Sequence, residues 1–493
     1  MSLLRKKTIE QSIADTDEPE YQLKKRLTAV DLTVFGIGVI IGAGIFTLTG
    51  RAAKTYAGPG IALSFVLAAI CCALAALCYA EFSSTVPVSG SAYTFSYFSL
   101  GEIFAWIIGW DLLLELLLGA SVVAQGWSTY AALFLEQIGL GWPESIGPDS
   151  SVNVLAMLLV VALATLATIG IKESLRVNLA LVAVKLFVVL FVIVAGLFYV
   201  QGSNLSPFIP PSVPAENGDV TITTPLFQAL FGFTPSTFGI MGVISGASLV
   251  FFAFIGFDVV ATTAEEAKNP QRDLPRGIIG SLAICTVLYV LVCIVITGMI
   301  NYTDINSEAA LAEAFRSVGR PGFATLISAG AVAGLTTVVL TLMIGAARVV
   351  FAMSRDHLMP RELGKTHAKW GTPYRLTIAI GILVALVAGL TPIGKLEEMV
   401  NIGTLAAFTL VSIAVPILRK RRPDIKRSFR VPGNPVIPIL AALICVYLML
   451  NLSLETWLRF AIWMALGFLV YFLYGYRRSR VGIEERTGES TRA

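Results

Sequence analysis

The sequence is poor in charged residues. Only 14% of its 493 residues are Asp, Glu, Lys or Arg, whereas 56% are hydrophobic, and the mean hydropathy is +0.78. This balance excludes a soluble globular protein, because long apolar runs recur along the whole chain. We therefore expect an all-α polytopic membrane protein.

Histidine is almost absent, and cysteine occurs only in apolar segments. The two histidines, His357 and His367, share one polar stretch, which excludes a histidine proton relay inside the membrane. The six cysteines are typical of small buried hydrophobic residues, not of a disulfide framework or a metal site. A Gly-x-Ser-x-Gly elbow and a Walker-type phosphate loop are also missing. The sequence therefore predicts no enzyme, no cofactor, no metal site and no nucleic-acid partner.

Twelve apolar segments approach or exceed the roughly 20 residues that a helix needs to cross a bilayer. They are 29–54, 58–86, 92–133, 152–171, 178–200, 240–264, 277–300, 322–353, 374–391, 396–418, 435–454 and 457–476. The sequence therefore predicts twelve transmembrane helices.

Basic residues are scarce on one side of this predicted topology. Loop 201–239 on that side has no Lys or Arg at all. Cytoplasmic loops carry an excess of basic residues, so we expect both termini in the cytoplasm and the protein in the plasma membrane, surrounded by lipid. The six basic residues predicted to lie outside are Arg51, Lys54, Arg316, Arg320, Lys395 and Arg459.

The spans divide the chain into two equal halves and a final pair. Five spans on each side of loop 201–239 predict a 5+5 inverted repeat, because an odd number of spans gives the halves opposite orientations. The predicted parts are a cytoplasmic N-terminal segment 1–28, a first repeat 29–200, the external loop 201–239, a second repeat 240–418, a basic cytoplasmic loop 419–434, two further spans 435–476 and a cytoplasmic tail 477–493.

Glycine interrupts the first span of each half. Four glycines lie between Gly36 and Phe46, and the second interruption is at Phe251–Asp258. Irregular backbone at membrane depth survives only where it lines a cavity or lies inside protein. Two breaks at matching places in two halves indicate the binding site of a secondary transporter built from discontinuous helices 1 and 6.

The ends of a broken helix suit a zwitterion such as an α-amino acid. The second half-helix begins with unpaired amides and partial positive charge, and the first half ends with unpaired carbonyls and partial negative charge. The amides predicted to hold a carboxylate are those of Gly42, Ala43 and Gly44. The carbonyls predicted to accept an ammonium lie near Ile40, Phe252 and Ile255. The alternative is that these glycines form a helix-packing face.

Six motifs together resemble one family. They are Gly42–Phe46, Gly109–Glu115, Phe254–Asp258, Glu265–Pro270, Arg272–Gly277 and Phe429–Gly433. Over residues 25–476 the chain is similar to the amino acid–polyamine–organocation superfamily, and to a bacterial version of its cationic amino acid transporter branch. The resemblance implies a LeuT-type fold and transport of amino acids, with arginine, lysine or ornithine favoured. Eukaryotic members of that branch have two further spans, which this sequence lacks.

Lys185 lies inside the fifth span, where a charge is costly and indicates function. In the resembling family, some proton-coupled members have a lysine in this span where sodium-coupled relatives bind sodium. We therefore expect Lys185 to brace the first span against the eighth and to make uptake proton-coupled and independent of sodium. The expected partners are the Gly38 carbonyl and the hydroxyl of Thr337 or Thr341. The alternative is a lysine whose ammonium reaches the cytoplasmic interface.

Other polar and bulky residues are candidates for the side-chain pocket. Asp111 and Glu115 are four residues apart and share a helix face, so Glu115 is expected to favour cations or to act in coupling, or else to bond neighbouring helices. Asp258 follows the second break and is expected to bind free amides or to gate the pathway. Phe252 is a candidate lid and Met343 a candidate wall, with ordinary packing as the alternative.

The sequence thus predicts a transporter that imports L-amino acids, cationic or small neutral, by proton-coupled alternating access. An exchanger without proton coupling and a sodium-coupled symporter of the same fold are the alternatives. An ion channel is disfavoured because no ring of carbonyls or charges repeats along the chain. A small membrane-protein partner is conceivable, and nothing in the sequence identifies one.

Overall fold

The computed structural model describes residues 5, 26–85, 91–148, 150–169, 175–214, 220–233, 236–305, 309–365, 367 and 372–487. These residues are mostly helical, which confirms the predicted all-α class. Strands β1 (Val213–Pro214) and β2 (Ser236–Thr237) pair antiparallel within the loop predicted to be external. Most of the segment 1–28 and the end of the tail 477–493 lie outside the described residues.

Every predicted apolar segment contains helix. Eight continuous helical stretches are long and apolar enough to cross a membrane: Gly44–Thr85, α6 (Glu102–Gln137), Leu179–Tyr199, Gly239–Ala264, α11 (Pro270–Met299), α13 (Pro321–Arg355), α15 (Ile393–Arg421) and Leu454–Arg478. Four shorter apolar helices are α2 (Ala29–Ile40), α7 (Val154–Ile169), α14 (Tyr374–Leu390) and α16 (Val436–Leu450).

The longer stretches and the connections contain several separate elements. The first stretch includes α3 (Thr49–Ala52) and α4 (Ile61–Thr85), and the third contains most of α8 (Leu175–Gly196). The fourth includes α10 (Gly239–Val250), and the eighth includes α17 (Leu454–Val470). The remaining helices of three residues or more in the described part are the short elements α5 (Ser91–Ser99), α9 (Leu226–Phe231), α12 (Ala310–Ser317), α18 (Tyr476–Arg478) and α19 (Arg480–Thr487), together with brief tighter or wider helical turns.

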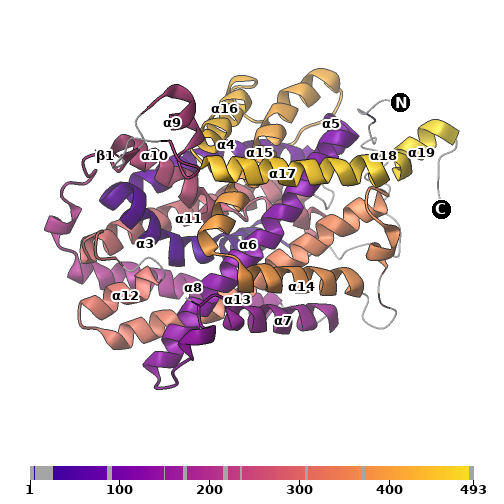
Figure 1. Cartoon of the computed structure of the whole chain (residues 1–493). Coiled ribbons are helices and arrows are strands. Elements are labelled where there is room, and N and C mark those ends of the chain that lie inside the picture. The colour runs from indigo at the N-terminus through magenta and orange to yellow at the C-terminus, as the bar shows by residue number, and fades with distance from the viewer. Residues whose placement is uncertain are drawn as a thin grey trace.

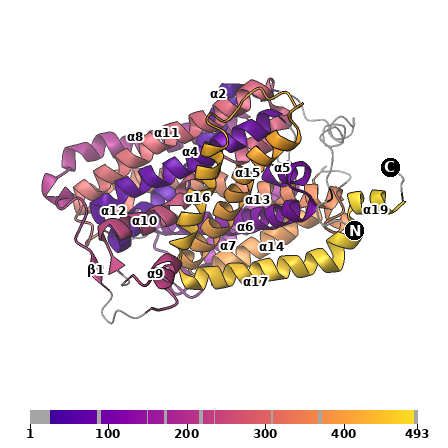
Figure 2. The same cartoon turned by 90° about the horizontal axis from the view of Figure 1, so that it is seen from above.

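Helix α6 forms the centre of the molecule, and α17 lies along its outside (Figures 1 and 2). In both views α19 lies at one end of the bundle, whereas β1 and α12 lie toward the other. Small residues let neighbours approach α6: a Cβ on Gly126 would lie 3.0 Å from the Thr47 methyl carbon, and one on Gly109 would lie 2.9 Å from the Met353 sulfur. The long central helix therefore supports the elements that carry the predicted site.

Three of the extensive helix contacts, including the two most extensive, join corresponding members of the two predicted repeats. Helix α6 packs on α13, α4 packs on α11, and α7 packs on α14. Each pair combines the helix of one half with the helix five spans later. The 5+5 inverted repeat itself stays a prediction.

A buried glutamate ties the basic loop 419–434 to the end of α4. Glu81 is 4% exposed, and its Oε1 accepts a hydrogen bond of 2.8 Å from Nε of Arg419. The second carboxylate oxygen accepts from Nη2 of Arg419 and from the backbone amide of Val431 at 2.7 Å. Arg427 Nε lies 3.5 Å from the same carboxylate. Glu81, to which the sequence alone assigned no role, thus holds this loop against the bundle.

We predict that Glu81→Gln destabilises the protein by roughly 3 kcal/mol, because it leaves the partly buried Arg419 and the buried Arg427 without their counter-charge. The measurement is thermal unfolding of the purified protein in detergent. Asp424→Asn is the matched control, since its ion pair with Arg422 is exposed and contributes little. Equal melting temperatures for Glu81→Gln and the unmodified protein would contradict the prediction.

Candidate functional site

The first broken helix is interrupted where the glycines predict it. Helix α2 ends at Ile40, and Ile41 has a ψ of 86°, outside the helical range. The chain resumes as a wide helical turn over Gly44–Leu48 and then as α3. All residues of the interruption are buried. An irregular backbone segment therefore lies in the interior of the helical bundle.

The second broken helix is interrupted four residues after α10. A tight turn at Phe251–Phe254 ends at Ile255, whose ψ of 137° is extended, and Gly256 has a φ of +119°. This positive φ favours glycine. A Cβ on Gly256 would also lie 2.7 Å from the Val39 side chain in α2. Glycine is thus required here both for the backbone turn and for the close approach of the two broken helices.

The two breaks contact each other directly. A Cβ on Gly44 would lie 2.2 Å from the Ala253 Cα, so the two backbones touch where no side chain intervenes. Gly38 packs on the Val182 side chain of α8, since a Cβ on Gly38 would lie 2.5 Å from a Val182 methyl carbon. Part of the glycine pattern therefore serves helix packing, which the sequence could not separate from ligand binding. Gly42 is less crowded, since its nearest neighbour, in α13, is a Val338 methyl at 3.3 Å.

Side chains from other helices donate to carbonyls at both breaks. The Ile40 carbonyl, predicted to accept an ammonium, accepts a hydrogen bond of 2.6 Å from the hydroxyl of Tyr289 in α11. The Phe46 carbonyl accepts a hydrogen bond of 2.8 Å from the hydroxyl of Tyr130 in α6. In the second half, Nδ2 of Asn401 in α15 donates to the carbonyls of Ser248 and Leu249 at 2.9 and 3.0 Å. Tyr130, Tyr289 and Asn401 were missed by sequence reasoning. Their only signal was a polar group within an otherwise apolar helix.

The remaining residues of the predicted pocket lie at different places. Phe252 and Ile255 are buried at the second break, and the Phe252 carbonyl accepts the Ile255 amide at 3.2 Å. Ala43 is fully buried, and its carbonyl accepts the Thr47 hydroxyl at 2.7 Å. The Met343 methyl points to α14, 3.7 Å from the Cβ position of Gly381.

Lys185 joins three helices one turn before the first break. Its ammonium donates to the Gly38 carbonyl at 2.6 Å, the contact that the sequence predicted, and the residue is 1% exposed. The Lys185 stem crosses α13 at Gly334, whose Cβ would lie 2.7 Å from the Lys185 Cγ. The hydroxyls of Thr337 and Thr341 donate to carbonyls of their own helix, each at 2.8 Å.

A group of buried acids lies on α6 beside the second break. Asp111 and Glu115 are 0% and 1% exposed. The Asp111 carboxylate oxygens have no hydrogen-bond partner among the described residues, whereas the Thr404 hydroxyl is near enough to Glu115 to interact with its carboxyl group. Asp258 is near enough to Glu115 to act on its charge, and its Oδ1 accepts the Gly256 amide at 3.2 Å. The hydroxyl of Tyr79 is also buried without a partner among these residues. Buried unpaired carboxyl groups are costly, which marks this group as a candidate site for a proton or a cation.

Comparison with known proteins shows the family to which the chain belongs. The amino acid permease family model matches residues 27–471. The methylthioribose transporter of Bacillus subtilis (strain 168) is 45% identical over 484 residues, which is 97% of this chain and 99% of that protein. The branched-chain amino acid permease of the same organism is 46% identical over 489 residues, with the same coverage. The vacuolar cationic amino acid transporter 4 of Arabidopsis thaliana is 36% identical over 428 residues, or 86% of this chain and 68% of that protein.

The family match covers both broken helices and all the residues of the predicted site. The relatives' names are those of transporters, so the prediction that the protein is not an enzyme is confirmed. The chain belongs to the amino acid permease family, within the amino acid–polyamine–organocation superfamily that the sequence motifs indicated, and it is a membrane transporter.

Proposed function

We propose that the protein imports L-amino acids across the plasma membrane by proton-coupled, sodium-independent alternating access. The observation that carries this proposal is the meeting of two interrupted helices in the buried centre of the bundle, beside a buried lysine. In this proposal twelve helices cross the membrane, both termini are cytoplasmic, and two inverted repeats of five spans surround the site. The pairing of α6 with α13, α4 with α11 and α7 with α14 supports the repeat.

The substrate backbone binds at the two breaks. Its carboxylate is held by the amides that begin the second half of the first broken helix, at Gly42, Ala43 and Gly44, where the half-helix has partial positive charge. Its ammonium is held by carbonyls at Ile40 and at the second break. The Ile40 carbonyl already accepts the Tyr289 hydroxyl, and a carbonyl oxygen has a second lone pair for the ligand.

Two classes of side chain are compatible with this site. The acids Asp111 and Glu115 favour a cationic amino acid, and the name of one similar protein refers to cationic amino acids. A second similar protein is named for branched-chain amino acids, whose side chains suit the apolar surroundings of Phe252 and Ile255. Uptake rates of L-arginine, L-leucine and L-alanine, measured under the same conditions, show whether cationic or apolar side chains are preferred.

Lys185 supplies the proton dependence. As an ammonium it donates to the Gly38 carbonyl and packs across α13 at Gly334, so it links a broken helix to the helices that surround it. Loss of its proton removes the charge and weakens this charge-assisted hydrogen bond. The first broken helix is then freer to move relative to α8 and α13, which is the motion that alternating access requires.

The coupling is tested in proteoliposomes that contain no internal amino acid. We expect an external pH below the internal pH to be sufficient to drive amino acid accumulation. We also expect the rate of uptake to stay unchanged when sodium is replaced by choline. An exchanger without proton coupling requires internal amino acid, so uptake only into preloaded vesicles would favour that alternative. Uptake that depends on sodium would favour the sodium-coupled symporter.

Replacement of Ala43 by leucine is expected to abolish amino acid binding, because the added carbons occupy the space beside the predicted carboxylate site. Binding is measured by calorimetry on purified protein, with thermal unfolding as the check that the variant folds. Ala43→Gly, which adds no volume, is the matched control and should bind. A folded Ala43→Leu protein with unchanged affinity would show that the ligand binds elsewhere.

Lys185→Met is expected to lower the ratio of internal to external amino acid reached in a pH gradient by about tenfold. This corresponds to about 1.4 kcal/mol of free energy. It should also flatten the pH profile of the remaining uptake, since the group that binds the proton is gone. Lys395→Gln is the control, because that lysine is more than half exposed on the predicted external side. The role of Lys185 is refuted if Lys185→Met accumulates substrate with the original pH profile.

A further inference from the structure

Four basic side chains at one end of the bundle lack an acidic partner. Arg272 and Arg276 lie at the start of α11, and Lys426 and Arg430 lie in loop 419–434. All four residues are exposed, and within the described part of the chain none of their side chains makes a hydrogen bond or an ion pair. We call these four residues the basic cluster. They lie on the side of the protein that the sequence predicts to be cytoplasmic.

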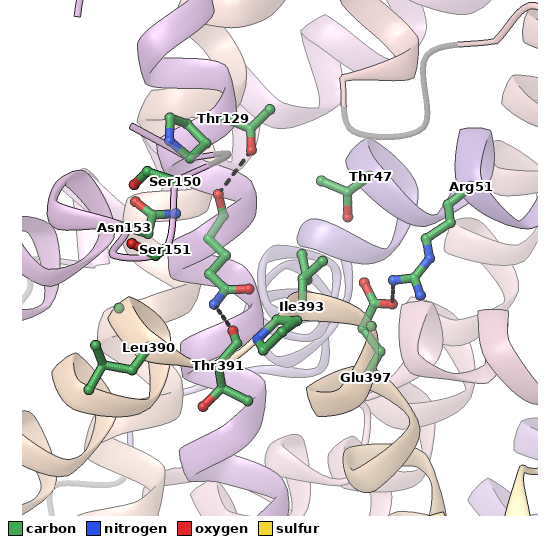
Figure 3. A pocket seen from close by; sticks show the side chains of 15 residues that line it. Thr47, Arg51, Thr129, Ser150, Ser151, Asn153, Leu390, Thr391, Ile393 and Glu397 are labelled. Carbon is green, nitrogen blue, oxygen red and sulfur yellow. Dashed lines mark hydrogen bonds and ion pairs between the residues drawn. The ribbon is translucent and has the colours of Figure 1, made fainter. Parts of the chain in front are cut away.

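On the side predicted to be external, most basic residues are paired. Four of the six predicted to lie there form ion pairs, which are Arg51–Glu397, Arg316–Glu313, Lys395–Glu455 and Arg459–Glu455. Figure 3 shows the first pair, in which Nη1 of Arg51 lies 2.6 Å from Oε2 of Glu397. The protein therefore neutralises much of its positive charge on that side, whereas the basic cluster stays available to an anion that is not part of the protein.

Loop 419–434 touches α11 in the middle of the basic cluster. The Ser428 hydroxyl donates to Oε1 of Gln271 at 2.9 Å, and this contact joins residues 157 positions apart in the sequence. Gln271 is next to Arg272 in the chain, and Ser428 is two residues from both Lys426 and Arg430. The contact therefore brings the basic residues of the loop to those of α11.

The acids nearest to the basic cluster along the chain have other environments. Asp273 follows Arg272 but lies on the buried side of α11, with an exposure of 8%. Asp424 pairs with Arg422. Glu81, which holds the loop from α4, already contacts two arginines that do not belong to the cluster. Net positive charge therefore remains at the surface where the loop meets α11.

The basic cluster stands at the end of an exposed apolar helix face. Arg272, Arg276, Ile279, Ala283 and Val287 follow one another in α11 at intervals of three or four residues, and all five are exposed. Residues at this spacing share one face of a helix. This face of α11 is therefore basic in its first two turns and apolar beyond them.

Two neighbouring helices add to this apolar surface. Helix α4 packs on both α11 and α16, and Sγ of Cys71 in α4 lies 3.5 Å from Sγ of Cys445 in α16. Helix α16 begins two residues after loop 419–434 (Figures 1 and 2). The large apolar residues that α4 and the first half of α16 expose are Leu63, Val66, Leu67, Ile70, Val436, Ile439, Leu440 and Leu443.

We propose that this surface binds an anionic phospholipid of the cytoplasmic leaflet. Its phosphate lies between the basic residues of α11 and those of loop 419–434, where arginine donates to phosphate in a two-pronged geometry. Its acyl chains lie along the apolar faces of α11, α4 and α16. A phospholipid fits because it carries the missing negative charge and the apolar chains on one molecule. A zwitterionic phospholipid fits less well, since its ammonium group meets further positive charge.

The bound lipid restrains two parts of the fold that are otherwise joined here by one side-chain hydrogen bond. The loop continues from α15, whereas α11 packs on α2 and donates the Tyr289 hydroxyl to the Ile40 carbonyl at the first break. A phosphate held from both sides bridges the loop and α11. Because the complete site exists only in the folded protein, we expect the lipid to raise the thermal stability of the protein.

The site is tested by thermal unfolding of the full chain, purified in detergent and depleted of lipid. Phosphatidylglycerol is expected to raise the melting temperature by about 3 °C, and phosphatidylcholine at the same concentration to raise it much less. Glycerol phosphate, which has the phosphate but no acyl chains, should have no effect. Native mass spectrometry of the same samples should show that phosphatidylglycerol is retained in preference to phosphatidylcholine.

A double variant, Arg272→Gln with Arg430→Gln, is expected to lose most of the difference between the two lipids. The matched control is Arg361→Gln with Arg477→Gln, which removes the same charge from exposed positions on the predicted cytoplasmic side, in the connection after α13 and in α18. The control should keep the full effect of phosphatidylglycerol.

Three results overturn the proposal. Equal effects of phosphatidylglycerol and phosphatidylcholine show a general effect of lipid. Equal losses in the two double variants show attraction to net positive charge without a defined site. An effect of glycerol phosphate as large as that of phosphatidylglycerol shows a site for a free anion. If the Arg272→Gln, Arg430→Gln protein is less stable without lipid, native mass spectrometry at low temperature decides, because preferential retention of phosphatidylglycerol by that folded variant also overturns the site.

Discussion

The structure depends on one constraint: backbone groups exposed by a broken helix inside a membrane must find partners. Water is scarce there, and each unpaired group costs several kcal/mol. In the first broken helix the partners are Lys185 on Gly38, Tyr289 on Ile40 and Tyr130 on Phe46. They come from three different helices, α8, α11 and α6. In the second broken helix, the side chain of Asn401 in α15 donates to two backbone carbonyls.

These donors also determine what is able to move. Each donor acts through a single side chain, so the proposed motion of a broken helix requires only a few of these hydrogen bonds to exchange. Tyrosine and asparagine donate in the same way at every pH near neutrality. Lysine is different, because its hydrogen bond depends on whether the ammonium is charged. Among the donors named at the two breaks, Lys185 is therefore the one whose strength follows proton binding.

The sequence was most informative where a residue type was costly in its setting. Glycines within an apolar span predicted the two breaks because glycine weakens a helix. A lysine within a span predicted the contact with the Gly38 carbonyl because a buried charge in a membrane needs a partner. Tyr289 and Asn401 were missed, since both residue types are ordinary in a helix and their role depends on which way they face. The close contact of Gly44 with Ala253 was also missed, because it joins segments more than 200 residues apart in the sequence. Facing and long-range register follow from packing of the whole bundle, which a single sequence does not specify.

The proposed partners of an amino acid at the two breaks are backbone amides and carbonyls, whose partial charges are already fixed by the half-helices. Full charges become more costly as burial increases, whereas fixed dipoles need no counter-ion once the ligand leaves. A site that must be empty for part of every transport cycle is therefore better built from backbone than from charged side chains.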